Sequence, residues 1–190
     1  MNHDADEVLM FWFGARGADQ PRAEWFKKDP AFDAEISARF GALIDSALAG
    51  GLTHWMADAH SALARILLLD QFTRNTGRDT PRAFAGDALA LAVARAMIAA
   101  GQDMALTPMQ RSFVYLPFEH SEDLAAQREG LMHFGVLAWQ HPACAAAFEW
   151  ALKHYDILVR FGRYPHRNAA LGRASTVSEL EFLAQPGSSF

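Results

Sequence analysis

The sequence contains a single cysteine, Cys144, so no disulfide bond can form within the chain, and a reducing compartment is favoured. Cys144 lies in the alanine-rich run PACAAAF, which predicts a small buried core residue rather than a reactive thiol. Basic residues are also scarce, because 17 Lys and Arg face 22 Asp and Glu, for a net charge of −5. Without a basic run or stripe, the chain lacks the charge pattern of a nucleic-acid-binding protein.

Long apolar runs are missing as well. The longest, 88–100, is interrupted by Arg95 and is too short to cross a bilayer. The first residues, MNHDADEV, carry acidic side chains where a secretory signal needs positive charge. We therefore expect a cytoplasmic protein with neither nucleic acid nor a membrane as its partner.

Alternating runs of β-branched residues, which are typical of strands, are absent, whereas Ala and Leu are abundant, so the sequence predicts an all-α protein. No linker or repeat divides residues 1–190, which we expect to form a single compact domain. The connections are short, which favours an antiparallel array of about 8–9 helices. Apolar periodicity and end signals predict the main helices at 6–13, 30–49, 58–72, 88–100, 108–117, 122–139, 142–161 and 178–184.

Particular residues mark the ends of these helices. Asp29 is expected to cap the second helix, with a proline in its first turn. Asp87 and Ser121 are expected to cap the helices that follow them, and Pro117 is expected to end the helix before it. The helix 88–100 is apolar on nearly every face, so we expect it to be central and buried.

Three segments combine aromatic residues with charged and amide groups, unlike the rest of the chain: 67–75 (LLLDQFTRN), 115–123 (YLPFEHSED) and 160–168 (RFGRYPHRN). At helical spacing Asp70 shares a stripe with apolar residues, so its carboxylate falls on a buried face. A buried carboxylate must find donors, become protonated or bind a cation. Arg74, one turn later, is the expected partner, and a structural ion pair is one interpretation.

Two similar dipeptides, Arg74-Asn75 and Arg167-Asn168, are predicted to lie in loops. Arginine offers a planar fork of donors to carboxylates and phosphates, and asparagine both donates and accepts. If the loops converge, their side chains surround an anion; if not, they bond loop carbonyls and hold helices together. The candidate anion-site residues are Arg74, Arg78, Arg163, His166 and Arg167, and Gln71, Asn75 and Asn168 are further ligand-binding candidates.

The densest ionisable group is Glu119, His120, Glu122 and Asp123. Carboxylates beside an imidazole can bind a divalent metal or perform acid–base chemistry. No established metal-binding spacing is present, so we assign no metal ligand and identify no cofactor. A helix N-terminus explains Glu122 and Asp123 better than it explains Glu119 and His120. The candidate catalytic residues are Asp70, Glu119, His120 and His166.

These segments also resemble a known family. The stretches VLMFWFG, WFKKDPAFD, LLLDQFTRN, PRAFAGD, YLPFEHSED and FGRYPHRN occur in order, and through them the chain resembles the bacterial domain-of-unknown-function family DUF924. Thr73 stands where we would expect proline. The resemblance implies an all-helical, tetratricopeptide-repeat-like fold and brings no established activity. The family's polar residues correspond to Asp70, Gln71, Arg74, Asn75, Glu119, His120, Ser121, Glu122, Arg163, His166, Arg167 and Asn168.

Three functional hypotheses follow. The first is a binding module whose polar, aromatic-lined pocket takes a small anionic ligand or a peptide end. The second is a hydrolase-type enzyme in which Asp70 or Glu119 acts as base and His120 or His166 as acid, with or without a divalent metal. The third is a purely architectural network that fixes helix register. The sequence leaves the oligomeric state open.

Overall fold

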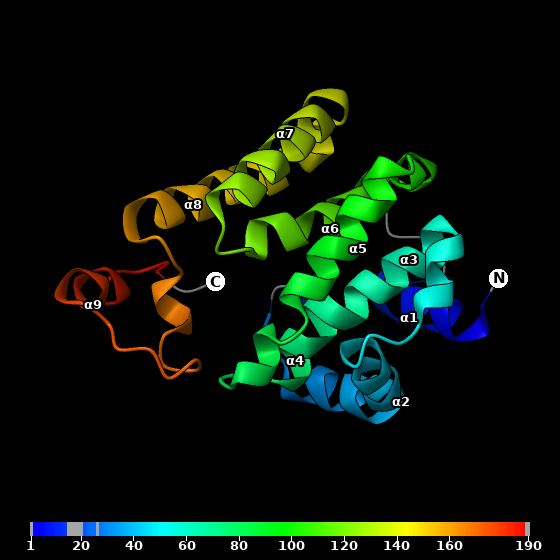
Figure 1. Ribbon diagram of the computed structural model, residues 1–190, viewed down its shortest axis with the longest axis horizontal. Coiled ribbons are helices and arrows are strands. Elements are labelled where there is room, and N and C mark those ends of the chain that lie inside the picture. Colours follow the sequence, from blue (N-terminus) through cyan, green and yellow to red (C-terminus); the bar gives the residue numbers. More distant parts are fainter. Residues whose placement is uncertain (1, 15–20, 26, 189–190) are drawn as a thin grey trace.

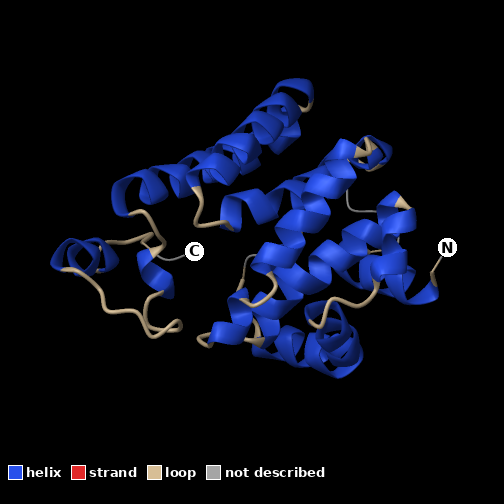
Figure 2. Ribbon diagram, in the orientation of Figure 1, coloured by secondary structure: helices blue, strands red, loops and turns tan. Residues whose placement is uncertain are grey.

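The computed structural model describes residues 2–14, 21–25 and 27–188, and within them every regular element is a helix (Figures 1 and 2). The prediction of an all-α protein is confirmed. No helix in these ranges is long and apolar enough to cross a membrane. The helices are α1 (His3–Phe13), α2 (Pro30–Leu48), α3 (Ala59–Ile66), α4 (Thr73–Thr76), α5 (Asp87–Ala99), α6 (Pro108–His120), α7 (Leu124–Gln140), α8 (Ala145–Phe161) and α9 (Val177–Leu183).

The centre of the fold is one continuous helix made of α3, a π-helical segment η3 (Leu67–Phe72) and α4. Every residue from 61 to 73 is buried, because the leucine-rich run LLLDQF offers apolar surface on all sides. The expectation that helix 88–100 would be central is wrong. Helix α5 buries only one side, through residues such as Val93 and Met97, since its opposite side is mostly alanine and has little apolar area to bury.

Aromatic side chains join the first half of the fold to this central helix. Trp12 of α1 packs against Phe72 with ring centroids 5.5 Å apart and against Phe113 of α6 at 5.8 Å. Phe40 of α2 packs on the other side of Phe72 at 5.2 Å. Cys144 is buried as predicted. The aromatic core therefore fixes where η3 lies relative to α6.

Helices α7 and α8 form an antiparallel hairpin that packs along α6 (Figure 1). Gly130 of α7 permits this approach, because a Cβ there would lie 2.6 Å from Cβ of Phe118 in α6. After α8 the chain turns at Gly162 and reaches a short 3₁₀ turn, η7 (Pro165–Arg167). Arg167 in this turn contacts Asp87 at the start of α5, so the returning segment closes over the N-terminus of α5.

The structure confirms some predicted helix ends and corrects others. Asp29 caps α2 as expected. Pro117 does not end α6, which continues to His120, because Phe118 packs in the core and the Gln127 side chain binds the Glu119 carbonyl. A proline so near the helix end removes only one backbone hydrogen bond.

Four further ends move by a few residues. Ser121 ends α6, and Asp123, not Ser121, caps α7 by accepting from the Ala126 amide. Asp87 is the first residue of α5 and not its cap, which is Gly86. The last helix begins after a Thr176–Glu179 capping box, one residue earlier than predicted. The predicted helix 58–72 continues through α4 because no helix breaker precedes Gly77.

Candidate functional site

The π-helical segment η3 carries Asp70, whose carboxylate is completely buried. Its oxygens accept from His120 Nδ1 at 2.7 Å, Gln71 Nε2 at 2.6 Å and Arg74 Nη1 at 3.1 Å. Burial pushes the pKa of Asp70 upward, but the charge of Arg74 and the hydrogen bonds from His120 and Gln71 outweigh burial and hold it far below its ordinary value. Asp70 is thus an ionised, fully coordinated carboxylate, and π-helical segments of this kind are frequent at functional sites.

Asp87 joins the central helix to the C-terminal segment. Its Oδ2 accepts from Arg74 Nη2 at 3.1 Å and from Arg167 Nη1 at 3.0 Å. Gly86 makes this approach possible, since a Cβ there would lie 2.1 Å from the Leu69 carbonyl oxygen. Sequence reasoning placed Asp87 only at a helix end, and its location in the stretch PRAFAGD was the one hint of a wider role.

Arg167 is buried between two aromatic rings. Its guanidinium carbon lies 4.6 Å from the ring centroid of Phe84 and 4.7 Å from that of Tyr164. The side chain is only 6% exposed, and within the described residues its buried Nε has no hydrogen-bond partner. Burial and the charge of Arg74 lower the pKa of Arg167, against the opposing effect of Asp87. The guanidinium therefore has less negative charge around it than a buried cation requires.

Glu119 and His154 form a second buried pair. Oε1 of Glu119 lies 3.1 Å from Nδ1 of His154, and Oε2 has no hydrogen-bond partner among the described residues. Burial, with a smaller effect from Asp70, raises the pKa of Glu119 to about 8. Burial and His120 lower the pKa of His154 to about 3. At neutral pH both groups are therefore uncharged, so their contact is not a salt bridge. The Nδ1–H of His154 donates to the Trp150 carbonyl oxygen at 2.9 Å.

Tyr164 and His166 complete the assembly. The Tyr164 hydroxyl donates to the Glu119 carbonyl oxygen, and its ring stacks on His166 with centroids 5.6 Å apart. Burial, followed by the charges of Arg167 and Arg74, lowers the pKa of His166 to about 3. Sequence reasoning missed His154 and Tyr164 because neither has a local partner pattern. We call the following set the polar cluster: Asp70, Arg74, Asp87, Glu119, His120, His154, Tyr164, His166 and Arg167.

Three other candidate residues form their hydrogen bonds and ion pairs outside the polar cluster. Asn75, in α4 rather than in a loop, donates to Asp33 of α2 at 2.7 Å, and Arg78 binds the same carboxylate. Arg163 pairs with Glu179 of α9 at 2.7 Å. These contacts hold α4 to α2 and α9 to the turn before η7, so Asn75, Arg78 and Arg163 do not join the polar cluster.

Asn168 and Glu122 likewise hold the C-terminal segment in place. Asn168 binds Arg173 and Ser175, at 3.0 Å each. The guanidinium of Arg173 forms two hydrogen bonds with Glu122, at 2.6 and 2.9 Å. These bonds fix the turn that carries His166 and Arg167 against the end of α6.

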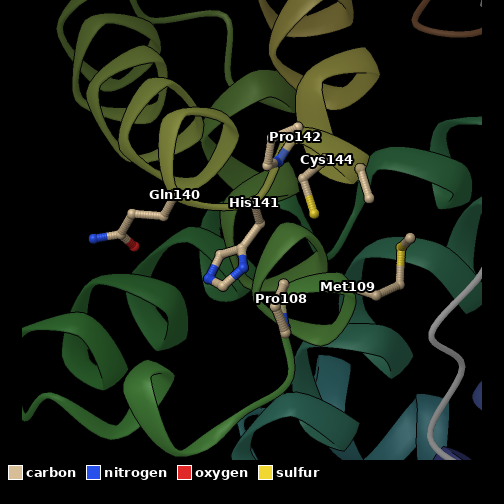
Figure 3. Close-up of a pocket in the computed structure, with 7 residues that line it drawn as sticks. Pro108, Met109, Gln140, His141, Pro142 and Cys144 are labelled. Atoms are coloured by element: carbon tan, nitrogen blue, oxygen red, sulfur yellow. The ribbon is translucent and has the colours of Figure 1, made fainter.

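The polar cluster reaches solvent along one edge. The side chains of Arg74, Asp87 and His120 are 20%, 16% and 14% exposed, whereas Asp70 and Glu119 are almost completely covered. A cavity of about 350 Å³ lies elsewhere, between the start of α6 and the turn 140–144 (Figure 3). In the described part of the chain, no group of three or more His, Cys, Asp or Glu side chains is arranged to hold a metal ion.

These features define an all-α protein with a connected set of buried ionisable side chains where its central helix, α6 and C-terminal segment meet. The chain belongs to the bacterial family of proteins of unknown function DUF924, whose model matches residues 8–187. It is similar to a solved structure described as a protein of unknown function, ATU0120, from Agrobacterium tumefaciens. The two share 39% sequence identity over 95% of this chain and 96% of that one, with a TM-score of 0.82. Comparison with curated proteins finds no match.

Proposed function

We propose that this protein binds a small anion, a carboxylate or phosphate group, at the exposed edge of the polar cluster. The observation that carries the proposal is the buried guanidinium of Arg167, whose Nε has no hydrogen-bond partner in the described chain. A second arginine, Arg74, shares the carboxylate of Asp87 with it. Paired guanidinium groups are well suited to planar, multivalent binding of carboxylates and phosphates.

The electrostatics of the neighbouring imidazoles support the same function. Burial, followed by the charges of Arg167 and Arg74, lowers the pKa of His166, so the field at this ring is positive. At His120, burial and Arg74 lower the pKa, whereas Asp70 and Asp87 oppose them. A positive field inside a poorly solvated cluster favours an incoming anion. Most of the cluster is buried, and the side chains that reach solvent, those of Arg74, Asp87, His120 and His166, are only partly exposed. The ligand must therefore be small or must present a narrow anionic group.

The first experiment is thermal unfolding at neutral pH with inorganic phosphate, sulfate, acetate or succinate, each compared with chloride at equal ionic strength. An anion present at 100 times its Kd stabilises the native state by about 2.7 kcal/mol. Arg167→Lys keeps the charge but loses the planar fork, so it should remove the response. Arg78→Lys is the matched control, because Arg78 binds Asp33 outside the cluster.

Two results would contradict this proposal. One is that no anion stabilises the wild type beyond chloride. The other is that Arg167→Lys and Arg78→Lys respond alike. In either case the cluster has an architectural role, and Arg167→Lys would act only through stability.

A second candidate, acid–base catalysis, is favoured by the contact between His120 Nδ1 and Asp70 Oδ1 at 2.7 Å. A carboxylate accepts from the protonated Nδ1, which leaves Nε2 as the basic nitrogen. Asp70 is then a positioning residue, since its own oxygens are already occupied. Hydrolysis of aryl phosphates or esters by the wild type, lost in His120→Asn but kept in His141→Asn, would support this role. No hydrolysis by the wild type would argue against it.

A further inference from the structure

One side of α7 is apolar and exposed. Met132, Val136 and Trp139 are 65%, 52% and 82% exposed, and their i, i+4, i+7 spacing places them on one face of the helix. The opposite face, with Phe134 and Leu137, is buried against the rest of the protein. An exposed tryptophan at the end of such a stripe is uncommon on a monomer and is typical of an interaction surface.

The stripe continues onto α8. Arg128 Nε, one turn before Met132, donates to the Tyr155 hydroxyl of α8 at 3.3 Å, so these two faces lie side by side. Leu152 precedes Tyr155 by one turn and is also exposed. Both helices of the hairpin therefore carry exposed apolar side chains, with Leu152 on α8 and Trp139 at the end of α7.

The cavity of about 350 Å³ begins immediately after Trp139 in the chain. Its walls are Pro108 and Met109 of α6 and the turn 140–144, and Trp139 is not among them (Figure 3). Among the described residues no carboxylate, lysine or arginine lines it, and a ring nitrogen of His141 provides the acceptor that an indole N–H would need. Its size and lining are suited to one aromatic side chain.

Trp139 directly precedes Gln140, a lining residue of the cavity, so an apolar projection and an apolar cavity are neighbours along the chain. When both halves of a contact are neighbours on one chain, a two-fold axis between them lets each copy fill the other, which is the geometry of an isologous dimer. We propose that two copies of this chain form a two-fold dimer in which Trp139 of each copy occupies the cavity of the other.

The available area is consistent with a second copy as occupant. A buried tryptophan contributes on the order of 200 Å². Met132, Val136 and Leu152, together with the cavity walls, extend the surface towards the roughly 800 Å² per partner of a standard interface. The stripe lacks charged residues between Met132 and Trp139, so an apolar partner fits it, and an identical stripe supplies one.

The test is sedimentation equilibrium of the full chain over a wide concentration range. The wild type should dimerise. Trp139→Ala removes one interface tryptophan from each copy, so it should weaken the dimer on the order of a thousandfold, about thirtyfold for each tryptophan. Trp150→Ala is the matched control: Trp150 is an exposed tryptophan of α8 outside the stripe, covered by the Lys153 ammonium. It should leave dimerisation unchanged.

Blocking the cavity provides an independent test of the proposed dimer. Ala143→Glu places a charge in the cavity without altering Trp139, so it should weaken the dimer as much as Trp139→Ala does. Trp139→Ala retains the open cavity, and Ala143→Glu retains the tryptophan. A mixed dimer of the two variants therefore keeps one of the two contacts, so the mixture should associate more strongly than either variant alone. A wild type that stays monomeric at all concentrations would overturn the proposal, as would a dimer that tolerates both substitutions. Circular dichroism of each variant establishes that these exposed positions leave the fold intact.

Discussion

Glu119 should control how the stability of this protein depends on pH. In the unfolded chain the carboxyl group of Glu119 loses its proton near pH 4.5, but burial raises the pKa of this group to about 8 in the folded protein. The folded state therefore retains a proton that the unfolded state has lost, and stability falls as the pH rises between these values. Linkage gives a loss of about 2.5 kcal/mol from pH 5 to pH 7, and on the order of 5 kcal/mol above pH 8.

Glu119→Gln removes this proton and keeps the shape of the side chain. Urea unfolding followed by tryptophan fluorescence gives the free energy of unfolding of both proteins at each pH. The wild-type value minus the variant value should fall by about 2.5 kcal/mol between pH 5 and pH 7. Subtracting the variant's free energy of unfolding from the wild-type value cancels the pH dependence contributed by His154 and His166, which has the opposite sign. Their pKa values are lowered from 6.5 to about 3, so they make stability rise with pH over that range.

The control is Glu129→Gln, which removes a half-exposed carboxylate that pairs with Arg95 at the surface. The difference in free energy of unfolding between the wild type and this variant should change by less than about 0.5 kcal/mol over the same pH range. A Glu119→Gln difference in the free energy of unfolding that is flat from pH 5 to pH 8 would contradict a protonated Glu119. It would mean that Glu119 is ionised in the folded protein and balanced by the charge of Arg74.

Two further predictions concern how the polar cluster is built. Gly86→Ala should destabilise by about 3 kcal/mol, because its Cβ would lie 2.1 Å from the Leu69 carbonyl oxygen. Gly41→Ala, in open space on α2, should instead stabilise by about 0.5–1 kcal/mol, and equal effects at the two sites would contradict the packing. Asp70→Asn should cost about 3–5 kcal/mol at pH 7. Because the folded pKa of Asp70 is depressed, this cost should shrink only as the pH falls below about 4, and a cost that shrinks between pH 8 and pH 5 would contradict the assignment.

Most of the helical architecture is predictable from local signals. Asp29, followed by a proline, marks the start of α2 through chemistry confined to a few neighbouring residues. The errors arise where packing between distant segments decides the outcome. Pro117 stays inside α6 because of Phe118 and Gln127, and α5 lies at the surface because the LLLDQF run takes the centre. A single sequence does not reveal which apolar helix its neighbours surround.

The same distinction applies to the site. The burial of Asp70 and its pairing with Arg74 follow from helical spacing, and the structure confirms both. The contacts of Asp87 with Arg167 and of Glu119 with His154 join residues far apart in the chain, so no local pattern predicts them. The sequence identified the segments that meet, but the way in which they pair depends on the tertiary fold.

The energetic pattern of the cluster bears on whether its role is only architectural. A network selected for stability alone should satisfy its buried polar atoms, because each unsatisfied one costs about 1–3 kcal/mol. Asp70 fits this expectation, with every donor around it engaged. Arg167 and Glu119 do not, since the buried Nε of one and the buried Oε2 of the other have no hydrogen-bond partner in the described chain. The proposed anion site predicts such a cost at Arg167, and an anion that stabilises the wild type but not Arg167→Lys would separate this proposal from a purely architectural network.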